Sequence, residues 1–123
     1  MADMTPVFEA LRAVLAPYSR VLAVQTDTAT ELYLDTHHAQ KNGKPLFFGA
    51  VQVKKGFVSY HLMPVYAQPA LLDAVSPALK ARMQGKSCFN FKAVEPALFA
   101  ELAALTHAGY DSYGKQGFVP ARP

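Results

Sequence analysis

The feature that most constrains the fold is a pair of β-type runs within residues 46–63, separated by a short glycine turn. The runs LFFGAVQV and FVSYHLM are rich in β-branched and aromatic residues, which favour strands. Lys55 and Gly56 lie between them, and glycine readily adopts the positive φ that a tight hairpin turn needs. With this turn, Gln52 pairs with Ser59. The sequence therefore predicts an antiparallel hairpin with a defined register.

Alternation along the hairpin divides its side chains between two faces of a sheet, because successive residues of a strand point to opposite sides. One face is almost entirely apolar and is expected in the core, whereas the other is only half apolar. The expected core face carries Phe47, Val51, Val53, Val58, Tyr60 and Leu62. The expected outer face carries Phe48, Ala50, Gln52, Ser59, His61 and Met63.

Further strands and several helices are expected on either side of the hairpin. Apolar residues at helical spacing predict helices, and alternating or β-branched runs predict strands. The expected strands are residues 20–25, 30–35 and 87–92, with a loop over 36–45. The expected helices are residues 5–16, 68–74 and 77–83, and a last one from Pro96 to just before Gly109.

This order of elements predicts the α+β class, because the strands are antiparallel and the helices are segregated from them. We expect an antiparallel sheet of about five strands with helices packed on one face, a two-layer sandwich. The length of 123 residues suits a single domain. Within it we expect a folded core over residues 5–110 and an irregular tail over 111–123.

Several classes of protein are disfavoured by what the chain lacks. Cys88 is the only cysteine, so no intramolecular disulfide can form, and this favours a cytoplasmic location. The first residues do not resemble a signal peptide, and no run of about 18 apolar residues predicts a membrane span. We therefore expect no membrane partner.

Positive charge is concentrated in the middle of the chain. The net charge is only +3, but residues 41–92 alone carry +7, with eight basic side chains and one acidic one. A basic rim beside a half-polar sheet face favours an anionic partner. Single-stranded nucleic acid would need exposed rings for stacking, and Phe48 is the one clear candidate, so nucleic acid is disfavoured.

Cys88 and His61 are both expected on the outer face, which raises the possibility of a thiol–imidazole pair. A histidine beside a cysteine can activate the thiol as a nucleophile. No acid is placed to orient the histidine, since Asp73 is the only acidic residue in the middle segment. A half-buried cysteine that only packs is therefore favoured over catalysis.

Two stretches resemble the YdhG-like domains of unknown function (domain of unknown function 1801). They are FGAVQVKKGFVSYHLMPVY, from Phe48 to Tyr66, and GKSCFNFK, from Gly85 to Lys92, and the resemblance extends over residues 5–110. It implies a frataxin-like fold and, as a function, iron delivery by a chaperone. In frataxin the iron site is an acidic ridge on the first helix and the next strand. The candidates here are Asp27, Glu31 and Asp35, whose spacing is too sparse to define a site.

The sequence thus predicts a small binding domain without catalysis of its own, which uses the outer face of its sheet. Its partner would be a protein, an anionic small molecule or a second copy of the chain, since a half-apolar face is itself an interaction signal. An iron chaperone and a thiol-dependent enzyme acting through Cys88 are the alternatives. The expected binding residues are Phe48, Gln52, Ser59, His61, Met63, Lys86, Cys88 and Asn90, with Lys92 at the rim.

Overall fold

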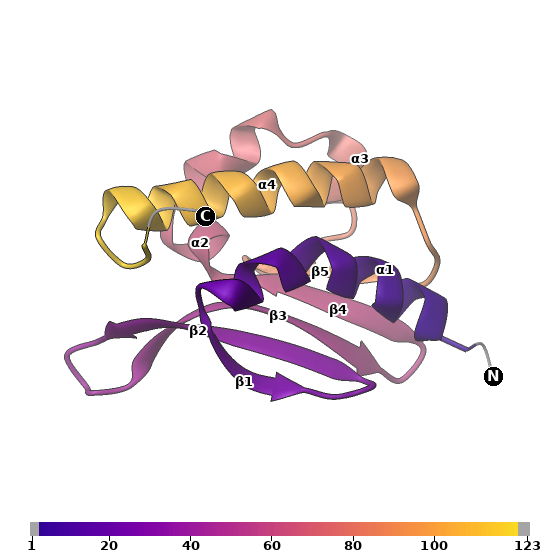
Figure 1. The fold of residues 1–123 in the computed structure, drawn as a ribbon. Coiled ribbons are helices and arrows are strands. Elements are labelled where there is room, and N and C mark those ends of the chain that lie inside the picture. The colour runs from indigo at the N-terminus through magenta and orange to yellow at the C-terminus, as the bar shows by residue number, and fades with distance from the viewer. Residues whose placement is uncertain (1–2, 121–123) are drawn as a thin grey trace.

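A computed structural model describes residues 3–120 and shows a five-stranded sheet covered by helices (Figure 1). Every neighbouring pair of strands is antiparallel, and the strands follow one another in chain order across the sheet. Their bounds are β1 Ala23–Asp27, β2 Glu31–Ala39, β3 Pro45–Lys54, β4 Phe57–Leu62 and β5 Cys88–Phe91.

All the described helices lie on one side of this sheet, and the long helix α4 crosses the top of the molecule in Figure 1. The arrangement confirms the predicted α+β class, with an open antiparallel sheet. The α-helices are α1 Thr5–Leu15, α2 Met63–Ala67, α3 Pro77–Lys80 and α4 Pro96–Lys115, and the 3₁₀ helices are η1 Ala16–Arg20 and η2 Pro69–Ala74.

The central hairpin forms in the predicted register. Gln52 lies opposite Ser59, and Ala50 lies opposite His61. Gly56 in the turn has φ 85°, a left-handed conformation that glycine adopts without steric cost. Local turn chemistry and strand alternation together were sufficient to place these two strands.

Phe47 was predicted on the core face and Phe48 on the outer face, and both assignments are wrong because a β-bulge interrupts β3. Leu34 pairs with Gly49, but the next residue, Asp35, pairs with Phe47, so Phe48 is the extra residue. An extra residue reverses the alternation beyond it. Phe48 therefore lies in the core with no exposed surface, and the half-buried Phe47 lies on the outer face.

The connections also differ from prediction. Strand β2 continues to Ala39, so the expected loop over residues 36–45 is shorter than predicted. Met63 is the first residue of α2 and not the end of a strand, and it packs partly buried against the core. Helix α3 ends at Lys80, and residues 82–84 run beside β5 instead of continuing the helix.

Helix α4 is longer than expected, because Gly109 does not end it. An ideal Cβ on Gly109 would lie 2.9 Å from Pro64 Cβ, so the glycine allows α4 to pass close to α2. The helix runs on to Lys115 and buries Tyr113, and Val119 beyond it is buried too. The predicted irregular tail is therefore wrong over residues 111–115, which are helical, whereas residues 116–120 form no helix or strand; residues 121–123 lie outside the described part.

The core fills the space between the sheet and the helices. Its centre includes Leu11 of α1, Tyr60 of β4 and Leu102 of α4, none with any exposed surface. The Tyr60 hydroxyl lies 2.6 Å from Thr106 Oγ1, which donates to the Leu102 carbonyl at 2.7 Å. Among the described residues, no helix is long and apolar enough to cross a membrane.

Candidate functional site

The side of the sheet opposite the helices is the candidate working surface, and we call it the outer face. No described helix lies over it (Figure 1). Strand alternation assigns its members, which are Glu31, Tyr33 and Asp35 of β2, Phe47, Ala50, Gln52 and Lys54 of β3, Phe57, Ser59 and His61 of β4, and Cys88 and Asn90 of β5.

Three polar side chains surround the sulfur of Cys88 on this face, and we call these three residues and Cys88 the thiol cluster. Ser59 Oγ lies 2.8 Å from Cys88 Sγ, and His61 Nε2 lies 3.6 Å from it. The thiol also donates to Asn90 Oδ1 at 3.4 Å. Ser59 and His61 can each act as donor or acceptor toward the sulfur, whereas Asn90 Oδ1 only accepts.

The pairing of β4 with β5 builds this cluster. His61 lies directly opposite Cys88, and Ser59 lies directly opposite Asn90, so the four residues form two adjacent cross-strand pairs. Directly opposed residues of an antiparallel pair have Cβ atoms about 4.5–5.5 Å apart, within reach of short side chains. The structure thus confirms the predicted meeting of Cys88 and His61 on one face.

Burial and a neighbouring lysine act together on the imidazole. Partial burial lowers the pKa of His61 from its ordinary value, and the positive charge of Lys54 lowers this pKa further. Both causes disfavour the protonated ring. The imidazole is therefore neutral near pH 7 and can accept a proton from the thiol.

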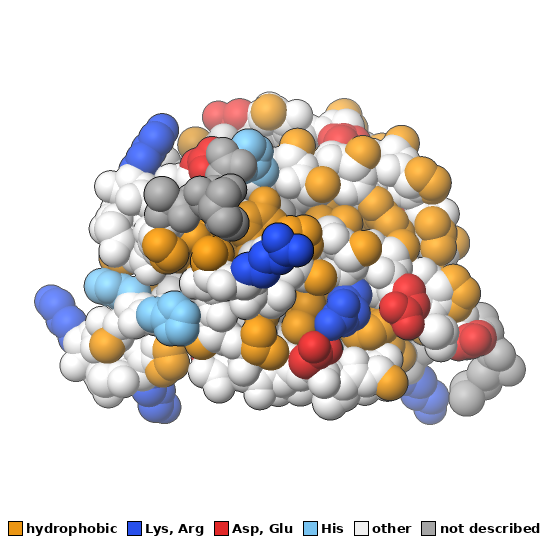
Figure 2. Space-filling model, viewed as in Figure 1, with side chains coloured by type: hydrophobic (Ala, Val, Ile, Leu, Met, Phe, Trp, Pro, Cys, Tyr) orange, Lys and Arg blue, Asp and Glu red, His pale blue; other side chains and the backbone are white. Residues whose placement is uncertain are grey.

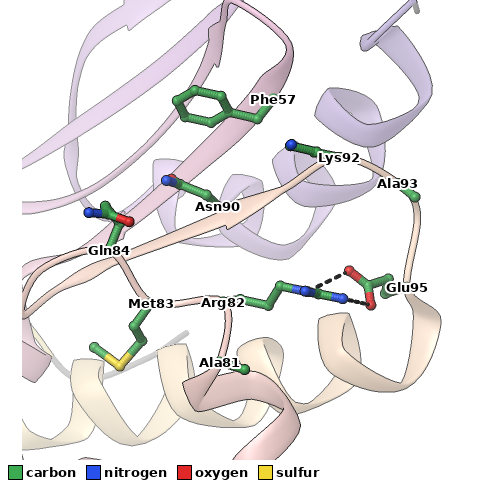
Figure 3. A pocket seen from close by; sticks show the side chains of 9 residues that line it. All are labelled: Phe57, Ala81, Arg82, Met83, Gln84, Asn90, Lys92, Ala93 and Glu95. Atoms are coloured by element: carbon green, nitrogen blue, oxygen red, sulfur yellow. Dashed lines mark hydrogen bonds and ion pairs between the residues drawn. The ribbon is translucent and has the colours of Figure 1, made fainter.

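A groove of about 530 Å³ lies beside the thiol cluster, and we call it the β5 groove (Figure 3). Its floor forms where residues 82–84 run along the outer edge of β5. Asn90 N donates to the Arg82 carbonyl at 2.8 Å, and Gln84 N donates to the Cys88 carbonyl at 2.9 Å. The groove is lined by Phe57, Ala81, Arg82, Met83, Gln84, Asn90, Lys92, Ala93 and Glu95.

The two cations of the groove differ in their partners. Arg82 donates two hydrogen bonds to the Glu95 carboxylate, at 3.0 and 2.8 Å, which largely neutralises it (Figure 3). Lys92 is exposed and forms no ion pair with any residue between 3 and 120. Lys92 is thus the cation in the groove that is available to an anion.

Asn90 belongs to both features. Its side chain contacts Cys88 and also lines the groove, so the thiol cluster and the β5 groove are continuous. Phe57 supplies an aromatic ring to the groove from the start of β4. The arrangement combines an apolar ring, amide groups and one unpaired ammonium, which is the mixture of groups typical of a small-molecule site.

The remaining predicted binding residues lie outside this site or serve other contacts. Gln52 donates to Glu31 at 2.6 Å on the outer face. Lys86 is exposed, and its ammonium lies 5.9 Å from the centre of the Tyr66 ring, a cation–π contact away from the thiol cluster. Phe48 is in the core and Met63 packs against it, so neither supplies the predicted apolar area on this face.

The three acidic candidates for iron do not converge. Asp27 faces the helices, where Arg12 of α1 donates to both of its oxygens at 3.0 Å. Glu31 and Asp35 lie on the outer face, and Asp35 is buried there with a hydrogen bond from Gln25. Burial raises the pKa of Asp35. Among residues 3–120, no group of three or more His, Cys, Asp or Glu side chains could hold a metal ion.

Sequence reasoning missed several residues of this surface. Phe47 stacks on Tyr33 with ring centroids 4.7 Å apart, and the bulge at Phe48 is what brings Phe47 to the outer face. Arg82 and Gln84 were expected within or just after a helix, so their place beside β5 was not foreseen. No local pattern marks that segment, because its backbone partners lie on a strand that follows it in the chain.

The basic side chains do not gather into one patch on the side shown in Figure 2. Lysine and arginine side chains are scattered singly over this view, which has the same orientation as Figure 1. Scattered charges of this kind are solvated and offer no continuous surface for a polyanion. The local charge at the β5 groove is therefore more informative than the overall positive charge.

Comparisons with known proteins do not assign the chain to a family. No family model matches it, and no curated protein or solved structure does so either. The resemblance to YdhG-like domains, the expected iron chemistry and the expected homodimer therefore stay predictions.

Proposed function

We propose that the chain is a non-catalytic binding domain that holds a small anionic ligand in the β5 groove, at the border of the outer face. The observation that carries this proposal is the contrast between the two groove cations. Glu95 neutralises Arg82, whereas Lys92 faces the same groove with no acidic partner among the described residues.

The other groups of the groove suit an anion with an apolar part. The amide side chains of Asn90 and Gln84 can donate hydrogen bonds to carboxylate or phosphate oxygens. The Phe57 ring provides an apolar wall. A volume of about 530 Å³ falls within the range of pockets that hold small molecules.

A titration with citrate, a compact tricarboxylate, tests the proposal. Two-dimensional ¹⁵N NMR spectra should show saturable shifts at Gln84, Asn90 and Lys92. A hydrogen bond to a charged group contributes about 1.5–3 kcal/mol, so Lys92→Gln should weaken binding by about tenfold or more. Added salt should also weaken binding, because it screens exposed charges.

Lys41→Gln is the matched control for this titration. It removes the same charge from an exposed lysine in the turn between β2 and β3, away from the groove. Its citrate affinity should equal that of the wild type. Equal affinities for Lys92→Gln and the wild type, or shifts that avoid the groove residues, would contradict the proposed function.

A further inference from the structure

We propose that Cys88 is a modification site, at which the thiol forms a mixed disulfide with a small anionic disulfide of the glutathione class. The inference goes beyond anion binding, because it requires a covalent exchange at the thiol cluster. It does not require the β5 groove to hold a ligand by itself. It also keeps the chain non-catalytic, since one molecule of protein reacts once.

The surroundings of the sulfur are those of a reactive thiol and not of a packing residue. A cysteine that only fills space lies among apolar groups, where its thiol is inert. Cys88 is half-buried on a face without a helix, and its sulfur contacts a hydroxyl, an imidazole and an amide at 2.8, 3.6 and 3.4 Å. The Ser59 hydroxyl, and the His61 ring once it is protonated, can stabilise a thiolate by donating hydrogen bonds to it, whereas Asn90 Oδ1 accepts from the thiol.

His61 provides the path for the proton. The neutral imidazole takes the thiol proton at Nε2 while Cys88 Sγ attacks one sulfur of the incoming disulfide. A new S–S bond forms at Cys88, and the original S–S bond breaks. The departing thiolate then takes the proton from His61. Cys88 is oxidised, and half of the small disulfide is reduced to a thiol.

The positive charge near the cluster favours an anionic reagent. Lys54 acts electrostatically on His61 from the neighbouring strand, and Lys92 lies in the groove next to Asn90. In the groove Arg82 neutralises Glu95, whereas Glu31 and Asp35 lie on β2, separated from the strand of Cys88 by β3 and β4. A positive local potential raises the local concentration of an anionic reagent. Once attached at Cys88, the tripeptide can extend past Asn90 into the groove.

The rate of adduct formation tests the proposal directly. The full chain is mixed with excess oxidised glutathione at pH 7, and intact mass spectrometry follows the adduct. The folded chain should react faster than the same chain in urea at the same pH, and Cys88→Ser should not react. His61→Gln should slow the reaction about tenfold or more, since a positioned base contributes at least that much.

Two results would overturn the proposal. One is a folded chain that reacts no faster than the unfolded chain, a comparison that needs no variant to fold. The other is a His61→Gln chain that is folded by circular dichroism and reacts as fast as the wild type.

Cystamine tests the anionic class of the reagent, because it carries a similar disulfide between two cationic groups. The rate of reaction with oxidised glutathione, divided by the rate with cystamine, should be larger for the folded wild type than for the unfolded chain. Lys54→Gln should reduce this ratio, and Lys41→Gln should leave it unchanged. A ratio that is the same in the folded and unfolded chains would overturn the anionic class.

Discussion

At the scale of single residues, His61 controls how the outer face responds to pH. Its ring contacts Cys88, and its pKa is lowered mainly by burial and further by the positive charge of Lys54. The unfolded chain, in which the ring is hydrated, therefore binds a proton at a higher pH than the native chain. Protonation favours unfolding, so stability falls as pH falls through about 6.5.

The pH dependence of stability checks this assignment. Replacing His61 with Gln removes the titrating ring, so the stability of His61→Gln relative to the wild type should improve steadily from pH 7.5 to pH 5. The free energy of unfolding in urea measures this difference. His37→Gln, at an exposed position of β2, is the control and should follow the wild type. A constant difference between His61→Gln and the wild type at all pH values would disprove the assignment.

At the scale of elements, the approach of α4 to α2 depends on Gly109. A Cβ there would lie 3.2 Å from Pro64 Cγ, a tight contact, and 2.9 Å from Pro64 Cβ, which is closer than real Cβ atoms come. Gly114, in the same helix, has only Val119 Cγ2 nearby, at 3.9 Å from an ideal Cβ. The two glycines of α4 therefore have different structural roles.

Alanine substitutions at the two positions should have opposite effects. Alanine favours a helix over glycine by about 1 kcal/mol, so Gly114→Ala should stabilise the chain by up to that amount. Gly109→Ala should destabilise it, because overpacking costs about 1–3 kcal/mol and exceeds the helical gain. Chemical denaturation measures both changes. Stabilisation by Gly109→Ala would show that the two helices can separate without cost.

At the scale of the whole molecule, a cluster of aromatic rings joins the sheet to the last residues described. Phe48 of β3 packs against Tyr110 and Tyr113 of α4, with ring centroids 5.8 and 6.0 Å apart. Tyr113 also contacts Phe118, and its hydroxyl donates to the Phe47 carbonyl at 3.0 Å. The bulge in β3 and the extension of α4 therefore support each other.

Removing the Tyr113 ring should destabilise the entire fold. Truncation of a buried aromatic residue costs about 3–5 kcal/mol, so Tyr113→Ala should lose about that much stability. Tyr113→Phe keeps the ring and loses one hydrogen bond, at a cost of about 1 kcal/mol. Ser112→Ala is the neighbouring control and should change stability by less than about 0.5 kcal/mol. If the midpoint of urea unfolding is the same for Tyr113→Ala as for the wild type, residues beyond Gly109 do not belong to the cooperative core.

The sequence alone determined the α+β class, the central hairpin and its register, and the shared face of Ser59, His61, Cys88 and Asn90. These features depend on local rules, namely the glycine turn and the alternation of side chains along a strand. Each of these inferences needed only residues that are close in the chain.

Only the tertiary structure decided which side chains touch. Ser59 and Cys88 are separated by 29 positions, and their contact depends on the connection that returns the chain to β4. The bulge that buries Phe48 depends on rings from α4, and the β5 groove depends on residues 82–84 running beside a later strand. Such features follow from competition for space among distant segments, and local periodicity carries no information about that competition.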